Sequence, residues 1–412
     1  MRKEALLAGV LALGLLGVTG CGSGSEPSNA GGKTDMTWAM WVGGTADQDA
    51  WQKVADTVNS KVPDVHITLQ GSTFADYFTK MSTQLSSNSA PCLVAVQSLR
   101  TTALKDGLLP LDDLVKKNNV NLADFDKSMI TGLSADGNLY GLPYDVGPMV
   151  MFYNKDKFKA AGLADPKPGW TTEEFLADAK KLSGAGKYAI AQNSADLNIE
   201  SQVLAYNGGR VVGADGTINA SDPQFAKGLQ WVSDLTNVEK VAAPIAGGDS
   251  SFGNNEFLAG STAMNIDGPW SLLDAKAKAK FNVGIVTLPA GSGGTATFSA
   301  GSGWGISKNC KTPDQAFKAL ETMTGPGMLG ELATAGRALS ARTAEQANWF
   351  DHAAIPGADA TIKAASTTAV PMPSSPNSDQ LGQLFNQYLV KSFNGQDSAA
   401  GVMKDIASQL PQ

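Results

Sequence analysis

Few residues in this chain of 412 have the types and spacing that local catalytic motifs require, since it holds only 2 His and 3 Cys. His66 and His352 have no His, Cys or paired carboxylates beside them at ligand spacing, so no zinc site is predicted. The run Gly32-Lys33-Thr34 resembles the end of a phosphate-binding loop. That motif needs another glycine five residues before Gly32, where this chain has Pro27. No Gly-x-Ser-x-Gly nucleophile elbow occurs either. The local motifs therefore predict no metal site and no cofactor.

The paired carboxylates of the sequence do not form a catalytic pair by themselves. The neighbours in Asp112-Asp113 and in Glu173-Glu174 diverge on a helix or a strand, so neither pair can flank a glycosidic bond. Thr171 and Glu174 have capping-box spacing, which predicts the start of a helix. Two distant carboxylates can still meet in a fold, so a secreted carbohydrate hydrolase stays open as an alternative. An exported metal- or anion-binding receptor is the other, although the scarcity of His argues against metal.

An acidic composition limits the partners of the chain. Its formal net charge of −7 and pI of about 5.0 leave no basic surface for phosphate backbones, so nucleic acid is not an expected partner. Charged residues make up only 17% of the sequence, which is typical of a packed chain rather than a disordered one. At about 150 residues per domain, the length predicts two or three domains, and we expect two large lobes.

Strands and helices alternate over the first hundred residues of the folded body. Short apolar runs predict strands, and apolar residues at helical spacing predict the helices between them. This order is typical of an α/β lobe with a parallel sheet. The predicted strands span residues 36–42, 65–70 and 93–96, and the predicted helices span 46–60 and 74–85.

A second α/β lobe is predicted after residue 148. The same patterns recur there, with the capped helix beginning at Thr171. The predicted strands span residues 149–153, 188–191, 263–266 and 283–288, and further helices span 222–237, 316–323 and 381–389.

The first twenty residues have the pattern of an export signal. A basic start precedes an uncharged apolar run, which is too short to span a membrane. The end of this run, Val18-Thr19-Gly20-Cys21, resembles the lipobox of bacterial lipoproteins, which implies cleavage before Cys21 and lipidation of its thiol. Residues 21–34 are then expected to form a lipidated N-terminus and flexible tether. The remaining two cysteines, Cys92 and Cys310, form either a disulfide or two separate buried thiols.

Several stretches together resemble the extracellular solute-binding proteins of ATP-driven importers, in the carbohydrate-binding group that includes maltose-binding protein. Their order and spacing carry the resemblance, which covers nearly the whole mature chain. Two departures are Cys92, where the family usually has Asp, and Ser340, where Pro is common. The matching stretches are Asn138-Leu139-Tyr140-Gly141-Leu142-Pro143-Tyr144, Met151-Phe152-Tyr153-Asn154-Lys155-Asp156, Trp170-Thr171-Thr172-Glu173, Tyr206-Asn207-Gly208-Gly209, Phe257-Leu258-Ala259-Gly260-Ser261-Thr262-Ala263-Met264, Gly268-Pro269-Trp270 and Gly301-Ser302-Gly303-Trp304-Gly305-Ile306-Ser307.

The resemblance implies a type II periplasmic-binding-protein fold, in which two α/β lobes are joined by three chain crossings and ligand lies between them. It places the crossings near residues 144–148, 297–301 and 337–342. The N-terminal lobe would then combine residues 35–144 with 300–338, and the C-terminal lobe 148–297 with 342–412. It also implies that strand 93–96 lies antiparallel to strand 304–307, which would bring Cys92 and Cys310 within disulfide distance.

The resemblance further implies a sugar site in the cleft. A pyranose has apolar C–H faces and a hydroxyl rim, so flat aromatic side chains and a few hydrogen-bonding groups suit it. The expected aromatic residues are Trp41, Trp270 and Trp304, each beside Gly or Pro at a strand end or in a loop. The expected polar residues are Gln97, Ser98, Tyr144, Asp145, Asp196, Asn198 and Arg337.

The resemblance implies a receptor that binds its ligand and catalyses no reaction. The protein would be anchored by lipid at the outer face of the cytoplasmic membrane. It would bind a sugar or oligosaccharide as a monomer and deliver it to the transmembrane subunits of an importer. Membrane contact would occur through the lipid anchor alone.

Overall fold

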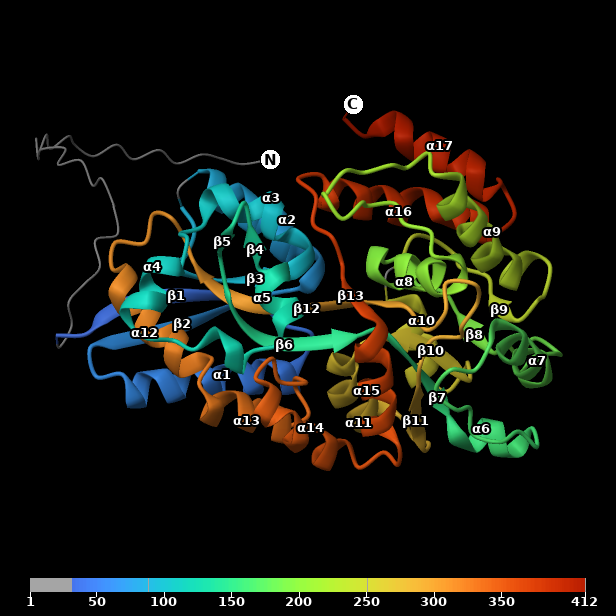
Figure 1. Cartoon of the computed structure of the whole chain (residues 1–412). Coiled ribbons are helices and arrows are strands. Elements are labelled where there is room, and N and C mark those ends of the chain that lie inside the picture. Colours follow the sequence, from blue (N-terminus) through green and yellow to red (C-terminus); the bar gives the residue numbers. More distant parts are fainter. Residues whose placement is uncertain (1–31, 88, 250, 412) are drawn as a thin grey trace, which may run out of the picture.

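Two sheets organise the chain, as a computed structural model that describes residues 32–411 except 88 and 250 shows. Figure 1 shows the two groups of strands side by side, each covered by helices. The six-stranded sheet and its helices form the first lobe, and the five-stranded sheet and its helices form the second lobe. The predicted signal peptide, Cys21 and most of the predicted tether lie outside the described residues.

The first lobe contains the strands predicted from the N-terminal third of the sequence. β1 pairs in parallel with β2 and β3, whereas β12 is antiparallel to both β3 and β6. The strand order is β13-β12-β3-β1-β2, with β6 also paired to β12. The strands are β1 (Thr34–Trp41), β2 (Val65–Ser72), β3 (Leu93–Gln97), β6 (Leu142–Pro148), β12 (Thr297–Ile306) and β13 (Ala369–Pro371).

Helices cover the first sheet through the apolar residues that predicted them. α1 (Thr45–Lys61) buries Trp51, Val54, Ala55 and Val58, one stripe at helical spacing. The Thr73 side chain caps the next helix by accepting a hydrogen bond from a backbone N–H of its first turn. The other elements of this lobe that bear on the site are α2 (Phe74–Ser86), η1 (Ser98–Arg100), α3 (Thr101–Leu104), α12 (Pro313–Met323) and α13 (Pro326–Thr334).

The second lobe has a mixed sheet in the order β11-β7-β10-β8-β9. β7 is antiparallel to both its neighbours, while β10, β8 and β9 run parallel to one another. These strands are β7 (Val150–Asn154), β8 (Ile190–Ala191), β9 (Ala242–Ala243), β10 (Met264–Asp267) and β11 (Val283–Val286).

The predicted capping box begins a helix of the second lobe. The Thr171 hydroxyl accepts from the Glu174 N–H, and the Glu174 carboxylate accepts from the Thr171 N–H. The helices of this lobe are α6 (Lys155–Ala160), α7 (Thr172–Leu182), α8 (Asp196–Asn207), α9 (Pro223–Asn237), α10 (Phe252–Leu258), η4 (Pro269–Ser271), α11 (Leu272–Lys278), α15 (Ala358–Thr368), α16 (Ser378–Phe393) and α17 (Ala399–Gln409).

Three segments that run between the lobes lie side by side. β6 pairs antiparallel with β12 from Ser299 opposite Pro148 onwards. The third segment, residues 337–342, contacts β6. Ser340 forms a bridge with Asp145, and the Val146 N–H donates to the Leu339 carbonyl at 3.1 Å. These are the stretches near which the sequence placed the chain crossings.

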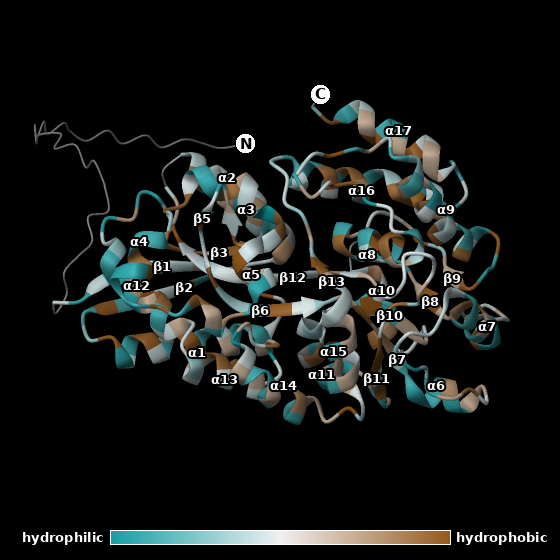
Figure 2. Cartoon of the chain, viewed as in Figure 1, coloured by the Kyte–Doolittle hydropathy of each residue, from teal (hydrophilic) through white to brown (hydrophobic). Residues whose placement is uncertain are grey.

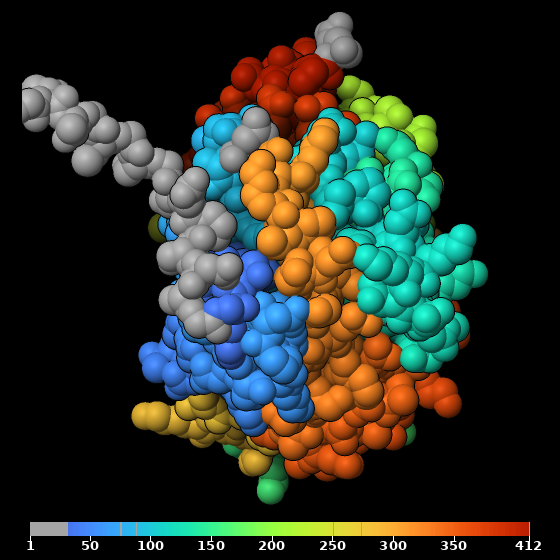
Figure 3. Space-filling model, turned by 90° about the vertical axis from the view of Figure 1, so that its left-hand side faces the viewer, coloured from blue at the N-terminus to red at the C-terminus, as the bar shows by residue number. Residues whose placement is uncertain are grey.

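Each lobe is built from segments that are distant in the sequence. Figure 3 shows orange atoms from the segment after β12 between the blue atoms of the first strands and helices and teal atoms from about residues 105–140. β13 falls in the range that the sequence assigned to the C-terminal lobe, yet it pairs with β12 at the edge of the first sheet. The reason is that β12 extends towards the second lobe, so its Thr297–Ser299 end pairs with β13 while Phe298 packs in the second core.

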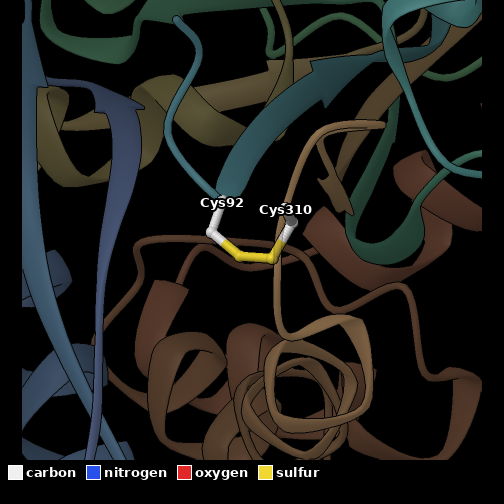
Figure 4. The surroundings of a disulfide bond; sticks show 2 residues. All are labelled: Cys92 and Cys310. Atoms are coloured by element: carbon white, nitrogen blue, oxygen red, sulfur yellow. A yellow bond between two sulfur atoms is a disulfide. The ribbon is translucent and has the colours of Figure 1, made fainter. Parts of the chain in front are cut away.

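The expected disulfide is present. β3 and β12 are antiparallel with Leu93 opposite Ile306, so the residues just outside this pair approach each other. Cys92 and Cys310 are bonded, and their Cα atoms lie 4.7 Å apart (Figure 4). The bond ties the loop after β12 to the start of β3 within the first lobe.

Hydrophobic residues colour β11 and part of β6, the long strand β12 is pale because it is rich in Gly and Ser, and hydrophilic residues colour much of α4 (Asp112–Lys117) and α6 (Figure 2). Within the described residues, no helix combines the length and the apolar character needed to cross a membrane.

Candidate functional site

A cavity of about 460 Å³ lies between the two lobes. The ends of β1 and β3, the start of α1 and α2, and β6 contribute from the first lobe. The loops that begin α8, α10 and η4 contribute from the second. Its lining residues are Trp41, Gly43, Asp47, Phe74, Gln97, Leu99, Arg100, Tyr144, Asp145, Asn193, Ala195, Asp196, Leu197, Asn198, Ser251, Asn254, Asp267, Trp270, Ser271, Asp274, Ala300, Gly301, Ser302 and Arg337.

Most of the residues singled out from the sequence meet in this cavity. From the first lobe and the connecting segments come Trp41, Gln97, Tyr144, Asp145 and Arg337. From the second lobe come Asp196, Asn198 and Trp270. Two expected site residues, Ser98 and Trp304, do not line it.

Trp304 is a core residue. Its side chain is fully buried and stacks on Tyr144, with ring centroids 4.4 Å apart. The glycines beside it do not display the ring in a loop. They let backbone pass, because a Cβ on Gly303 would lie 2.6 Å from the Leu142 carbonyl oxygen and one on Gly305 would lie 2.4 Å from that of Tyr140. Trp304 therefore supports Tyr144, which does line the cavity.

Ser98 lies one layer behind the cavity wall. It is buried, and its hydroxyl accepts a hydrogen bond of 3.3 Å from the Gly301 N–H. Gly301 itself lines the cavity. Ser98 thus positions β12 at the site instead of facing the cavity.

Two tryptophans stand on opposite sides of the cavity. Trp41 ends β1 and is held edge-on against Tyr77, with ring centroids 5.1 Å apart. Trp270 lies in η4, where its indole N–H donates to the Asp267 carboxylate at 2.8 Å. The Trp270 ring packs against Gly268, where a Cβ would lie 2.2 Å from the ring. The two rings are therefore fixed by neighbours and do not depend on ligand for their orientation.

Phe74 is an aromatic residue of the cavity that the sequence did not single out. It belongs to the apolar repeat of α2, and that repeat predicted burial in the core. In the structure it is 45% exposed, with its ring 5.7 Å from that of Trp41. Phe74 is the first residue of α2, and this position at the start of the helix is the sequence feature that could have indicated exposure to the cavity.

Arg337 lines the cavity in an ion pair with Asp47, a residue that the sequence did not single out. Both side chains are largely buried, at 8% and 15% exposed. The guanidinium also lies over the Trp51 ring, 4.3 Å from its centroid. Asp47 additionally accepts from the Gly43 N–H at 2.8 Å. The two residues are 290 positions apart, so only the fold pairs them.

Arg100, also missed from the sequence, forms the second ion pair of the site. Its Nε lies 2.6 Å from Oδ1 of Asp379 in α16, so the pair joins the first lobe to the second. The same guanidinium donates to Gln97 Oε1 and lies 4.3 Å from the centroid of the Phe78 ring.

Burial raises the pKa of two carboxyl groups of the cavity. Burial raises the pKa of Asp145 to about 7, while the Arg337 guanidinium and the Ser302 N–H, which donates at 2.6 Å, act in the opposite direction. Burial likewise raises the pKa of Asp267, opposed by hydrogen bonds from Ser271, Gly268 and Trp270. Near neutral pH the Asp145 carboxyl group can therefore serve a ligand as an acceptor and, when protonated, as a donor.

Side-chain amides complete the polar part of the wall. Asn198 donates to the Ile266 carbonyl at 2.6 Å, and the Asn193 amide oxygen accepts from the Gly253 N–H at 2.6 Å. These bonds fix the amides at the N-terminal ends of α8 and α10. Fixed amides, carboxyl groups and aromatic rings around one cavity can bind a polyhydroxylated molecule.

The described residues offer little for other chemistry. Among them, no group of three or more His, Cys, Asp or Glu side chains is arranged to hold a metal ion. His66 pairs with Asp35 at the surface of the first lobe, with 3.0 Å between Nδ1 and Oδ1.

Comparison with known proteins gives one family and several relatives. The family model described as bacterial extracellular solute-binding protein matches residues 43–329. The maltooligosaccharide ABC transporter solute-binding lipoprotein of Streptococcus pneumoniae serotype 4 is 26% identical over 347 residues, covering 77% of this chain and 76% of its own. The sn-glycerol-3-phosphate-binding periplasmic protein of Yersinia enterocolitica is 28% identical over 226 residues, covering 49% of each chain.

Solved structures show the same arrangement of the chain. An ABC substrate-binding protein from Listeria monocytogenes, solved in complex with cycloalternan, superposes with a TM-score of 0.83 at 22% sequence identity. The match covers 91% of this chain and 97% of that one.

Proposed function

The chain belongs to the family of bacterial extracellular solute-binding proteins and has their type II periplasmic-binding-protein fold, and from this premise we propose that it is an exported receptor for a sugar or oligosaccharide. It delivers this ligand to the transmembrane subunits of an ATP-driven importer. It acts as a monomer and performs no bond chemistry. The ligand class is supported by the relative from Streptococcus pneumoniae, which is named for maltooligosaccharides.

One observation carries this proposal. Trp41 and Trp270 stand on opposite lobes of a single cavity whose remaining wall is rich in carboxyl and amide groups. Aromatic rings cover the C–H faces of a pyranose, and the polar groups bond its hydroxyls. A cavity of about 460 Å³ is large enough for more than one sugar unit.

Ligand binding is coupled to closure of the two lobes in this proposal. Trp41 and Trp270 can contact one ligand together only when the lobes approach each other. A ligand that gains contacts in the closed form shifts the population towards it. The hinge consists of β6, β12 and the segment 337–342, which lie side by side.

A lipid on Cys21 holds the receptor at the outer face of the membrane. The support is the lipobox-like Val18-Thr19-Gly20-Cys21 and the word lipoprotein in the name of the pneumococcal relative. β1 begins at Thr34, so the proposed tether comprises the residues between Cys21 and this strand. Mass spectrometry of the mature protein from membranes would find the lipidated Cys21 peptide. An intact unmodified N-terminus would contradict the anchor.

A thermal-shift panel tests the proposal as a whole. The purified chain from residue 34 onwards would be heated with neutral mono- and oligosaccharides, and with divalent metal salts and sugar-free buffer as controls. A ligand selective for the folded state raises its stability by RT ln(1 + [L]/Kd). We expect stabilisation by at least one carbohydrate, without release of shorter sugars during incubation. Sugar turnover would favour the hydrolase alternative, and stabilisation by metals alone would favour the metal receptor.

A further inference from the structure

The charge of the ligand is left open by family membership, since the two relatives compared above are named for ligands of different charge. The ion pairs of the cavity bear on this question. The inference below rests on the proposed function, because it concerns which carbohydrates the same cavity admits.

Both cationic side chains in the described lining of the cavity, Arg100 and Arg337, already have carboxylate partners. Arg337 pairs with Asp47, and Arg100 pairs with Asp379 at 2.6 Å. The arginine side chains are only 8% and 11% exposed, respectively. An anionic ligand that approaches either guanidinium meets a charge that a carboxylate already neutralises, and drawing the guanidinium away would leave a partly buried carboxylate unpaired, which is costly.

The remaining contacts of these arginines also hold them in place. Arg100 donates to Gln97 Oε1 and lies over the Phe78 ring, and Arg337 lies over the Trp51 ring. Each guanidinium is therefore fixed by a carboxylate and an aromatic face. Turning either guanidinium towards a new anion would weaken both contacts.

The other ionisable side chains of the lining are acidic or phenolic. Four carboxyl groups without an arginine ion pair face the same cavity, and none of them attracts a negative charge. Burial raises the pKa of two of them, Asp145 and Asp267, and a nearby anion would raise it further. The four are Asp145, Asp196, Asp267 and Asp274.

We propose that this cavity selects carbohydrates that carry no anionic group, and that Asp379 and Asp47 enforce the selection by occupying its two arginines. Uncharged and amino-substituted sugars can donate to the carboxyl groups that have no arginine partner. The carboxyl groups of the cavity repel phosphorylated and carboxylated sugars, and both arginines are already paired with carboxylates. Asp379 thus acts as a specificity residue from α16, outside the cavity lining itself.

The first test compares three forms of one ligand. The first form is the neutral oligosaccharide that stabilises the protein most in the panel. The second is the same sugar with its primary C6 hydroxyls oxidised to carboxylates, and the third is the methyl ester of that uronate. The ester matches the uronate in its carbon skeleton and lacks its charge. We expect calorimetry to find the uronate bound at least about tenfold more weakly than the ester, a modest effect for negative charge in a partly buried site.

Two outcomes of this comparison would overturn the inference. Equal affinity for ester and uronate, whether tight or weak, would show that charge is not the property selected. Tighter binding of the uronate would show the opposite selection. Either result would leave the sugar-receptor proposal standing, whereas failure of every carbohydrate in the panel would refute both.

The second test frees one arginine. Asp379→Asn leaves Arg100 without its carboxylate, so the uronate should gain at least about tenfold relative to the ester. Asp405→Asn is the matched control, because Asp405 pairs with Lys391 at 3.7 Å between α17 and α16, away from the cavity lining. It should leave the uronate-to-ester ratio unchanged.

Asp47→Asn gives an independent measurement at Arg337, and it keeps the test decisive if the Asp379 variant is unstable. Folding of each variant would be checked by its thermal transition. An unchanged uronate-to-ester ratio in the folded variants, or an equal change in Asp405→Asn, would refute the assignment to these two carboxylates.

Discussion

Trp270 is the side chain whose loss should weaken ligand binding most clearly. Its ring lines the cavity and is fixed by the Asp267 carboxylate, so it contributes contact area without a large loss of conformational freedom. We expect Trp270→Ala to weaken binding of the best neutral sugar about tenfold or more, as measured by calorimetry. Trp231→Phe is the control, because Trp231 stacks on Tyr206 outside this cavity. Unchanged affinity in the Trp270 variant would remove the ring from the proposed site.

Asp145 should make the stability of the protein depend on pH. Its pKa is raised to about 7 from 3.8, so between these values the folded protein holds a proton that the unfolded chain has lost. Stability should therefore fall as pH rises from about 4 to about 7. In Asp145→Asn this contribution disappears, and the amide oxygen can still accept from the Ser302 N–H. We expect the free energy of unfolding of the variant to rise relative to that of the wild type as pH rises through this window.

Urea unfolding at pH 5 and pH 8 would measure the effect of the Asp145 change. Asp314→Asn is the control, since it removes a half-exposed carboxylate from α12 that pairs with Lys117. If the difference in unfolding free energy between Asp145→Asn and wild type were the same at both pH values, the raised pKa would be contradicted.

The sequence predicted the site residues that follow strand ends or carry the family motifs. Trp41, Gln97 and Trp270 belong to this group, because the ends of strands must open towards the cleft in an α/β fold. Trp304 was misplaced because glycine beside a tryptophan looks the same whether it forms a loop or lets a neighbouring strand approach. Asp47 was missed because its partner, Arg337, is 290 positions away and meets it only in the folded chain.

At the scale of elements, β12 depends on its glycines. A Cβ on Gly303 would lie 2.6 Å from both the Leu142 carbonyl oxygen and a methyl group of Leu133, and backbone cannot easily yield. We expect Gly303→Ala to destabilise the protein by about 2 kcal/mol or more in urea unfolding. Gly327→Ala in α13 is the control, because its Cβ would meet no atom within 4 Å and the change should be neutral or stabilising. Equal stability of both variants would contradict the close packing of β6 on β12.

The disulfide should stabilise the first lobe without affecting binding. It closes a sequence separation of 218 residues, and neither cysteine lines the cavity. We expect Cys92→Ser with Cys310→Ser to lower the free energy of unfolding by a few kcal/mol and to leave sugar affinity unchanged. Alkylation and mass measurement of the non-reduced mature protein would check the bond first. Two free thiols there would refute it.

The longer elements of the fold could be predicted because each repeats one pattern over several residues. α1 and α9 bury one face, and β1 and β3 are short apolar runs bounded by turns. β13 could not be predicted, since three residues carry no periodicity and their strand partner lies 72 positions away in β12. Short elements of this kind are defined by the sheet they join.

At the scale of the molecule, ligand should bring the two lobes together. The cavity takes its walls from both lobes, and the segments between them are confined to one place. We expect small-angle scattering to give a smaller radius of gyration with saturating sugar than without it. Trp270→Ala at a sugar concentration that saturates only wild type should show a smaller change. An unchanged radius in the wild type on saturation would contradict closure.

The resemblance to the family predicted discontinuous lobes, whereas nothing in the sequence predicted the ion pair between the lobes. Arg100 and Asp379 are 279 residues apart, and each looks like an ordinary surface charge in its own helix. Only the approach of α16 to η1 brings them into contact and gives them a role in the site.

The bond between Cys92 and Cys310 also makes the molecule convenient as an optical sensor. The sequence has three cysteines, and a chain beginning at Thr34 omits the first, so its remaining two sulfurs are already bonded to each other. A single cysteine substituted for Ser251, an exposed residue of the cavity rim, would then be the sole target for a maleimide dye. Its emission would change as sugar displaces water beside it, so natural ligands could be sought directly in culture fluid.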